Sequence, residues 1–319
     1  GLTMGTNYQI KYTPNAKVRA PALVKIGIDS VLTEINRQMS TYLPDSEISR
    51  FNRSESLVPM AVPMEFEYVV SRALSWARKT HGAFDITVFP LLYLWGFGPG
   101  GTGAPDSFPD SSDVEKRLSQ VGRDKLVSEN GVLRKLNPFV SIDLNAIAKG
   151  FGVDAVFDYL LSQGIFDMMV EIGGEVRVRG LNPQSKLWTI AIEKPKLSAE
   201  IEERFDWIID LDNEAMATSG DYRNFFEIDG KIYSHEIDPR TGYPSRNSVA
   251  SASVTAPNCT DADALATALM IMDVDEGMKL VESLPEVEAF LLVRQSISQF
   301  IYRRSSGMTV RAIGETRNN

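Results

Sequence analysis

An acid and a hydroxyl four residues apart mark a segment of this sequence that could hold a metal ion. Asp263 and Thr267 lie in the run from Cys259 to Met270, which has the composition of a helix start, and residues four apart share one helix face. Together with a backbone carbonyl, they would supply the hard oxygen ligands that Mg²⁺ prefers, with positions left for substrate phosphates. Taken alone, the segment is explained more simply as an ordinary helix start, in which Asp261 is the cap and Thr267 packs.

A second segment, residues 141 to 150, could bind a phosphate. It passes from strand-like alternation into a helix, with Asp143 or Asn145 as the expected N-cap and Lys149 one turn inside. A helix N-terminus presents unpaired N–H groups and a positive dipole to an anion, and a lysine adds a full charge. The plainer alternative is a capped helix with a surface lysine, because such caps are common.

Two polar segments add ionisable groups. Asp85 follows a helix stop and precedes an apolar run, so it either contacts a ligand or starts a turn. Of the two histidines, His81 lies at an expected helix end, where a cation is favourable in any case. His235 lies in a polar loop with Asp238 and Arg240, which makes it the better candidate for proton transfer.

Composition and missing motifs exclude several function classes. The 33 Lys+Arg against 42 Asp+Glu give a net charge of -9 without a basic cluster, which argues against nucleic acid as a partner. The single cysteine excludes an intramolecular disulfide and a cysteine-based zinc cage. No serine occupies a G-x-S-x-G elbow, and the glycines at 98 to 103 and 173 to 174 fit neither a phosphate loop nor a Rossmann turn.

The elements that must position these residues alternate irregularly between helix and strand. Apolar spacing predicts helices over 21 to 39, 63 to 79 and 113 to 120, besides those that start near 143 and 260. Strand patterns cover 4 to 12, 168 to 178, 188 to 193 and 207 to 211, with a hairpin turn at 229 to 230. We therefore predict a mixed α/β (α+β) fold in one unit spanning residues 1 to 319, because no segment has the composition of a linker.

Ordered sequence blocks across most of the chain resemble the ApbE family of FAD:protein FMN transferases. The blocks are MGT at 4 to 6, MSTYLPDSEISRFN at 39 to 52, GAFDITVFPLLYLWGFG at 82 to 98, DLNAIAKG at 143 to 150, IGGEVRVRG at 172 to 180, TSGDYRNFFEIDGKIYSHEIDPRTGYP at 218 to 244 and TDADALATALMIM at 260 to 272. Segments that are ambiguous one by one then agree on a single ligand, a flavin dinucleotide with a divalent metal.

The resemblance implies a role for each matching position. FAD contacts fall on Met4, Tyr42, Ala83, Phe84, Asp85, Asp143, Lys149 and Ile237, and Mg²⁺ contacts fall on the Ala146 carbonyl, Asp263 and Thr267. Some members carry a further acid where this chain has Ala266, so that ligand is absent here. FAD is then the substrate, and a threonine or serine of an acceptor protein receives FMN as AMP is released.

The base that deprotonates the incoming hydroxyl is expected to be His235, with Asp143 or a metal-bound water as alternatives. A magnesium-dependent FAD pyrophosphatase and a non-catalytic FAD carrier remain the rival functions. By family analogy the acceptors are subunits of respiratory or redox complexes. The analogy also predicts an enzyme on the periplasmic side of the bacterial inner membrane, held by a lipid on a cysteine before Gly1.

Overall fold

A computed structural model describes residues 1–14, 20–101, 108–193, 205–221, 225–228, 231–234, 236–295 and 299–313. Its main sheet has eight antiparallel strands in the order β1-β2-β6-β7-β10-β13-β14-β15. Smaller sheets have the orders β16-β9-β8 and β3-β5-β4, and β11 pairs with β12. The predicted mixed α/β class is confirmed, whereas the single unit across residues 1 to 319 stays a prediction.

The helices of the described residues are α1 (Pro21–Met39), α2 (Glu47–Arg53), α3 (Met64–Lys79), α4 (Phe89–Leu94), α5 (Ser111–Leu118), α6 (Asn145–Ser162), α7 (Cys259–Ile271) and α8 (Val274–Glu282), with 3-10 turns η1 (Ile86–Val88) and η2 (Arg123–Lys125). The strands are β1 (Leu2–Thr3), β2 (Thr6–Tyr12), β3 (Met60–Ala61), β4 (Leu126–Glu129), β5 (Val132–Lys135), β6 (Met168–Ile172), β7 (Glu175–Arg179), β8 (Trp188–Glu193), β9 (Phe205–Leu211), β10 (Ala215–Gly220), β11 (Phe225–Ile228), β12 (Lys231–Ser234), β13 (Val249–Ala256), β14 (Glu288–Arg294), β15 (Phe300–Arg304) and β16 (Arg311–Ala312).

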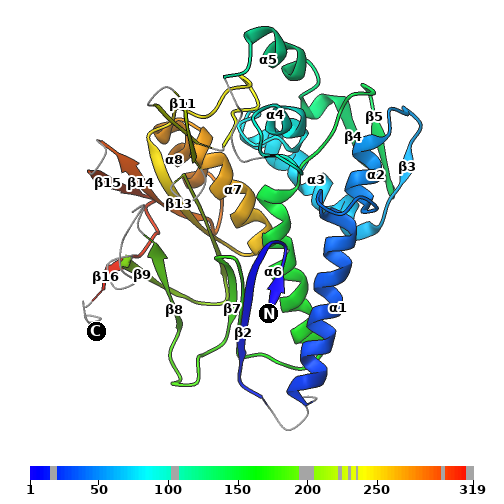
Figure 1. The fold of residues 1–319 in the computed structure, drawn as a ribbon. Helices are drawn as coiled ribbons and strands as arrows, with labels where there is room; N and C mark the ends of the chain where they lie inside the picture. Colours follow the sequence, from blue (N-terminus) through cyan, green and yellow to red (C-terminus); the bar gives the residue numbers. More distant parts are fainter. Residues whose placement is uncertain are drawn as a thin grey trace.

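The main sheet is covered on both faces. Helices α6 and α7 lie side by side against one face, with α1 outside α6, and the β8–β9 sheet lies against the other (Figure 1). Strand β7 shows how the sequence achieves this, since its side chains alternate between the two faces. Val176 and Val178 pack in a cluster with Trp188 and Leu211 of the small sheet. The alternate residues Glu175 and Arg177 bond to side chains of α6. The charged side chains of this strand therefore face the helix pair.

Several predicted boundaries are corrected. The strand expected over 168 to 178 is a hairpin, because Gly173 and Gly174 both have positive φ and break it into β6 and β7. The strand expected over 4 to 12 is observed as β2 and begins at Thr6, because Met4 and Gly5, with φ of 49° and 72°, form the two-residue turn that joins it to β1. Helix α5 begins and ends two residues earlier than expected, at Ser111–Leu118. The expected turn at residues 229 to 230 lies outside the described residues.

Among the helices that the structure describes, none combines the length and the apolar composition needed to cross a bilayer.

Candidate active site

A cavity of about 1180 Å³ opens beside the α6–α7 pair, the end of β10 and the segment after α3. The residues predicted to bind a ligand or a metal come from stretches far apart in the sequence, yet all those that the structure describes line this one cavity. They are Met4, Tyr42, Ala83, Phe84, Asp85, Asp143, Ala146, Lys149, Ile237, Asp263 and Thr267. His235, the expected base, lies outside the described residues.

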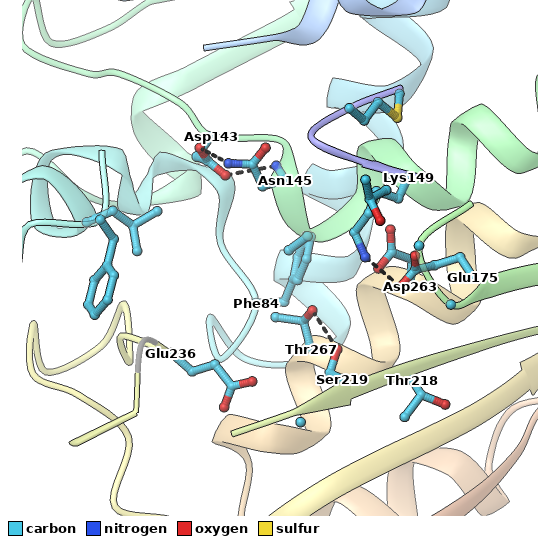
Figure 2. A pocket seen from close by; sticks show the side chains of 18 of the residues that line it. Phe84, Asp143, Asn145, Lys149, Glu175, Thr218, Ser219, Glu236, Asp263 and Thr267 are labelled. Carbon is cyan, nitrogen blue, oxygen red and sulfur yellow. Dashed lines mark hydrogen bonds and ion pairs between the residues drawn. The ribbon is translucent and has the colours of Figure 1, made fainter. Parts of the chain in front are cut away.

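The three predicted metal ligands line the cavity from the two neighbouring helices, Ala146 from α6 and Asp263 and Thr267 from α7. Asp263 is 2% exposed, and its Oδ2 accepts a hydrogen bond from the Gly150 N–H at 2.9 Å. In a regular α-helix that N–H points at the Ala146 carbonyl, so the Asp263 carboxylate and this carbonyl meet at one amide. One turn along α7, the Thr267 hydroxyl lies 3.2 Å from the Ser219 hydroxyl of β10 (Figure 2). The chemistry of this donor set, hard oxygens only, suits a divalent cation such as Mg²⁺.

Helices α6 and α7 can pack this closely because residue 150 is a glycine. A Cβ on Gly150 would lie 2.3 Å from the Cys259 carbonyl oxygen, closer than atoms can pack. One turn further along α6, the buried Asp154 accepts bonds from the N–H groups of Cys259 and Thr260 at 2.9 and 2.8 Å. Arg177 of β7 donates to the same carboxylate at 2.8 Å. The N-terminus of α7 is therefore fixed to α6 at two successive turns.

A lysine lies between two buried carboxylates on the cavity wall. Lys149 Nζ is 2.5 Å from Glu175 Oε1, with the Asp263 carboxylate close by (Figure 2). The Lys149 side chain is 32% exposed, whereas the Glu175 side chain is 2% exposed. Burial disfavours the ammonium, but Glu175 and Asp263 outweigh that effect and raise the pKa of Lys149. The lysine therefore stays charged and keeps an exposed portion toward the cavity, where it can contact a phosphate.

Burial also raises the pKa of Asp263, although Lys149 and the Gly150 N–H oppose the shift. A carboxylate whose charge is disfavoured by burial gains stability from any cation that binds beside it. The raised pKa of Asp263 is therefore compatible with the predicted role as a metal ligand.

Asp143 lies immediately before α6 and points into the same cavity (Figure 2). Its two carboxylate oxygens accept hydrogen bonds from the Asn145 backbone N–H at 2.8 Å and from the Asn145 side chain at 3.0 Å. The N-cap position itself is Leu144, which has no capping side chain, so the expected cap at Asp143 or Asn145 is off by one residue. Burial raises the pKa of Asp143 to about 6, within the range of a group that exchanges protons near neutral pH.

Asp85 has both oxygens occupied by neighbouring groups of the chain. Oδ1 accepts from the Thr87 N–H at 2.9 Å and from its hydroxyl at 2.7 Å, while Oδ2 accepts from the Arg123 N–H at 2.9 Å. Of the two roles expected for it, starting a turn is therefore observed, because Asp85 caps η1. The same bonds hold the cavity wall formed by Phe84, which is 3% exposed.

Met4 and Tyr42 form part of the rim. The left-handed backbone of Met4 places its side chain over α6, where Gly152 leaves room for it: a Cβ there would be 3.2 Å from Met4 Cε. Tyr42 is 64% exposed. An aromatic ring standing in solvent beside a cavity is a group that can stack on a planar ligand.

Two site residues are absent from the sequence-based set, Glu175 and Ser219. Glu175 lies within the block IGGEVRVRG at 172 to 180, where an acid stands among apolar strand residues. Nothing in the neighbouring sequence connects it to Lys149.

Within the described part of the chain, no three His, Cys, Asp or Glu side chains gather as a metal cage. The predicted ligand set is compatible with this, since only one of its members, Asp263, is of those types.

Comparison with known proteins identifies the family of this chain. The model of the ApbE family matches residues 4–291. A "FAD:protein FMN transferase" of Vibrio cholerae is 47% identical over 283 residues, which are 89% of this chain and 83% of that relative. The solved structure of the flavin transferase ApbE from Vibrio cholerae superposes with a TM-score of 0.87 at 44% identity, covering 96% of both chains. The apo flavinyl transferase ApbE of Pseudomonas stutzeri gives 0.86 at 34% identity, covering 96% and 93%.

The fold and these relatives define a flavin transferase of mixed α/β class. The chain belongs to the ApbE family.

Proposed function

We propose that this protein transfers FMN from FAD to a threonine or serine hydroxyl of an acceptor protein, with Mg²⁺ as the metal and AMP as the leaving product. The observation that carries the proposal is that Asp263, Thr267 and Ala146 line one cavity of about 1180 Å³ together with Lys149. Displacement at phosphorus builds charge on phosphate oxygens, so a metal site and a lysine are the groups that such a reaction needs most.

Each named residue would have a distinct task. Asp263, Thr267 and the Ala146 carbonyl would hold Mg²⁺, which when bound polarises the phosphate oxygens. Lys149 and the N-terminus of α6 orient the diphosphate and offset its charge. Phe84 and Tyr42 would contact the rest of the dinucleotide.

The reaction exchanges one phosphorus–oxygen bond for another. The acceptor hydroxyl oxygen attacks the FMN phosphorus, the bond to the AMP oxygen breaks, and AMP departs with the charge. The hydroxyl proton must go to a base. His235 is the predicted base, and Asp143, whose pKa burial raises to about 6, is the alternative among the described residues.

The partners and the cellular place follow from the family analogy and belong to this proposal. The acceptors would be subunits of respiratory or redox complexes, and the enzyme would work on the periplasmic side of the inner membrane with a lipid anchor.

The test uses purified protein, FAD, Mg²⁺ and a protein extract from cells of the source organism that lack this gene. Flavin fluorescence in a denaturing gel and mass spectrometry of the labelled band should show FMN bonded to a threonine or serine. Chelation of Mg²⁺ is the control and should abolish labelling. Release of free FMN and AMP without a labelled protein would indicate the rival pyrophosphatase, and binding of intact FAD without any product would indicate a carrier.

A further inference from the structure

One edge of strand β10 is open where it borders the cavity. Along its first edge, all six residues from Ala215 to Gly220 pair with β13. Along the other edge, β7 pairs only with Ala215 and Met216, because β7 begins at Glu175 after the Gly173–Gly174 turn. From 217 to 220 this second edge has no strand partner among the described residues, and residues 218 to 220 line the cavity.

The hydrogen-bond pattern tells which backbone groups point out from that edge. The Glu214 carbonyl accepts from the Val178 N–H at 3.0 Å, so residue 214 points toward β7. The Asp221 N–H donates to the Ala250 carbonyl at 3.2 Å, so residue 221 points toward β13. Backbone direction alternates along an antiparallel strand. The N–H and C=O groups of Thr218 and Gly220 therefore point away from β13, toward the open edge.

This edge lies next to the reaction centre. Ser219, between the two outward-pointing residues, bonds to Thr267 on α7 at 3.2 Å (Figure 2). A strand added to the edge would lie about 4.8 Å from β10. It would pass beside the predicted metal ligand Thr267, and the small side chains of 218 to 220 leave room for it.

We propose that the acceptor protein presents its reactive threonine or serine on an extended segment that binds as an added strand along the open edge of β10. The proposal rests on the proposed function and specifies how its second substrate is held. The donor and acceptor groups of Thr218 and Gly220 recur every two residues, about 6.8 Å apart, which is the repeat of a peptide backbone.

The size of the cavity favours a second reactant beside FAD. The cavity of about 1180 Å³ is larger than the roughly 300–1,000 Å³ typical of a site for one small ligand. It therefore has space for a second reactant, and a single extended strand is the narrowest form in which a peptide can satisfy its backbone groups.

The first test needs no variant of the enzyme. Hydrogen exchange at the Thr218 and Gly220 amides is measured in three samples: the enzyme alone, the enzyme with FAD and Mg²⁺, and the enzyme with its acceptor protein. The acceptor is the protein identified by gel fluorescence, and its reactive residue is changed to alanine so that it binds without being labelled. We expect hydrogen exchange at these two amides to slow only when the acceptor is present. Protection by FAD and Mg²⁺ alone, or no protection by the acceptor, would overturn the proposal.

The second test removes one outward N–H. Thr218→Pro deletes that group and no ladder bond to β13, since a proline is tolerated on an open strand edge. Thr218→Val is the matched control, because it deletes the hydroxyl that bonds to Ser253 but keeps the N–H. Gly220→Pro deletes the other outward N–H, in case Thr218→Pro lowers the melting temperature.

Relative to the valine variant, the proline variant should raise the acceptor KM by at least roughly 3- to 10-fold, the effect of one lost hydrogen bond. Its FAD affinity should be unchanged. Equal acceptor KM in the two variants would refute the docking edge, and a matched loss of FAD affinity would assign the edge to FAD. A parent enzyme that binds FAD but labels no protein would instead refute the proposed function, and the docking edge with it.

Discussion

The contact between α6 and α7 makes Gly150→Ala the most informative single substitution. In an open helix interior this change stabilises a protein by about 1 kcal/mol. Here the added Cβ would lie 2.3 Å from the Cys259 carbonyl oxygen and 2.8 Å from Asp263 Cβ. Neither atom is the end of a flexible side chain, so the helices must separate.

The expected magnitude follows from two destabilising effects that act against the gain in helix propensity. Overpacking typically costs about 1–3 kcal/mol, and the Gly150 N–H bond to the Asp263 carboxylate contributes about 1.5–3 kcal/mol if it is lost. Together these two costs exceed the gain of about 1 kcal/mol in helix propensity, so we expect a net loss of about 2–4 kcal/mol in the free energy of unfolding. The shift of Asp263 away from the Ala146 carbonyl should also weaken Mg²⁺ binding by roughly 10- to 100-fold, as displacement of supporting groups does.

Gly152→Ala, two residues along the same helix, is the control. Its added Cβ would meet Met4 Cε at 3.2 Å and Ile172 Cδ1 at 3.3 Å, both ends of movable side chains. This variant should stay within about 1 kcal/mol of the parent. Urea denaturation measures stability, and calorimetric titration measures Mg²⁺ affinity. If Gly150→Ala matched Gly152→Ala in both measurements, the close approach of the helices would not be what builds the site.

Three further predictions concern single side chains. Asp263→Asn should lower Mg²⁺ affinity by at least roughly tenfold while calorimetric FAD binding without metal persists; unchanged Mg²⁺ affinity would remove Asp263 from the ligand set. Asp143 has its pKa raised by burial from 3.8 to about 6, so the native state holds the proton more tightly than the unfolded chain. Its stabilising contribution is present below pH 4 and is lost as pH rises through 6. The parent should therefore lose about 2 kcal/mol relative to Asp143→Asn between pH 4 and 7 in urea titrations, and parallel curves would contradict this. His235→Asn should keep FAD affinity but slow single-turnover transfer by roughly 10²- to 10⁴-fold, and unaltered transfer would move the role of base to Asp143 or a metal-bound water.

The spacing of apolar residues predicted a helix or strand correctly where a single helical or strand period runs through the whole element. The helix over 21 to 39 is observed as α1 (Pro21–Met39), since Pro21 fits a first turn and the apolar spacing is regular. The strand over 168 to 178 was wrong as a single element because apolar alternation continues through the Gly173–Gly174 turn. Periodicity shows which residues face inward, but it does not show where the chain reverses.

The site residues were predicted from ordered sequence blocks. The same blocks indicated the family that the comparisons confirm. Their residue types fixed the chemistry in outline: hard oxygens at Asp263 and Thr267, and a cation at Lys149. Individually these segments were compatible with ordinary helix caps, because capping and ligand binding use the same side chains.

Only the tertiary structure decided which of these groups meet. Glu175 lies 26 residues from its partner Lys149, and Asp263 lies 113 residues from the Gly150 amide that it accepts from. The open edge of β10 likewise exists because β7 begins only after the Gly173–Gly174 turn, whereas β13 runs along the whole of β10. The sequence by itself determined the element types and the chemical groups, because these depend on neighbours within a few residues. Distances between groups depend on how helices and strands pack. Packing depends on contacts between distant residues, such as that of Gly150 with Cys259, that no local pattern encodes.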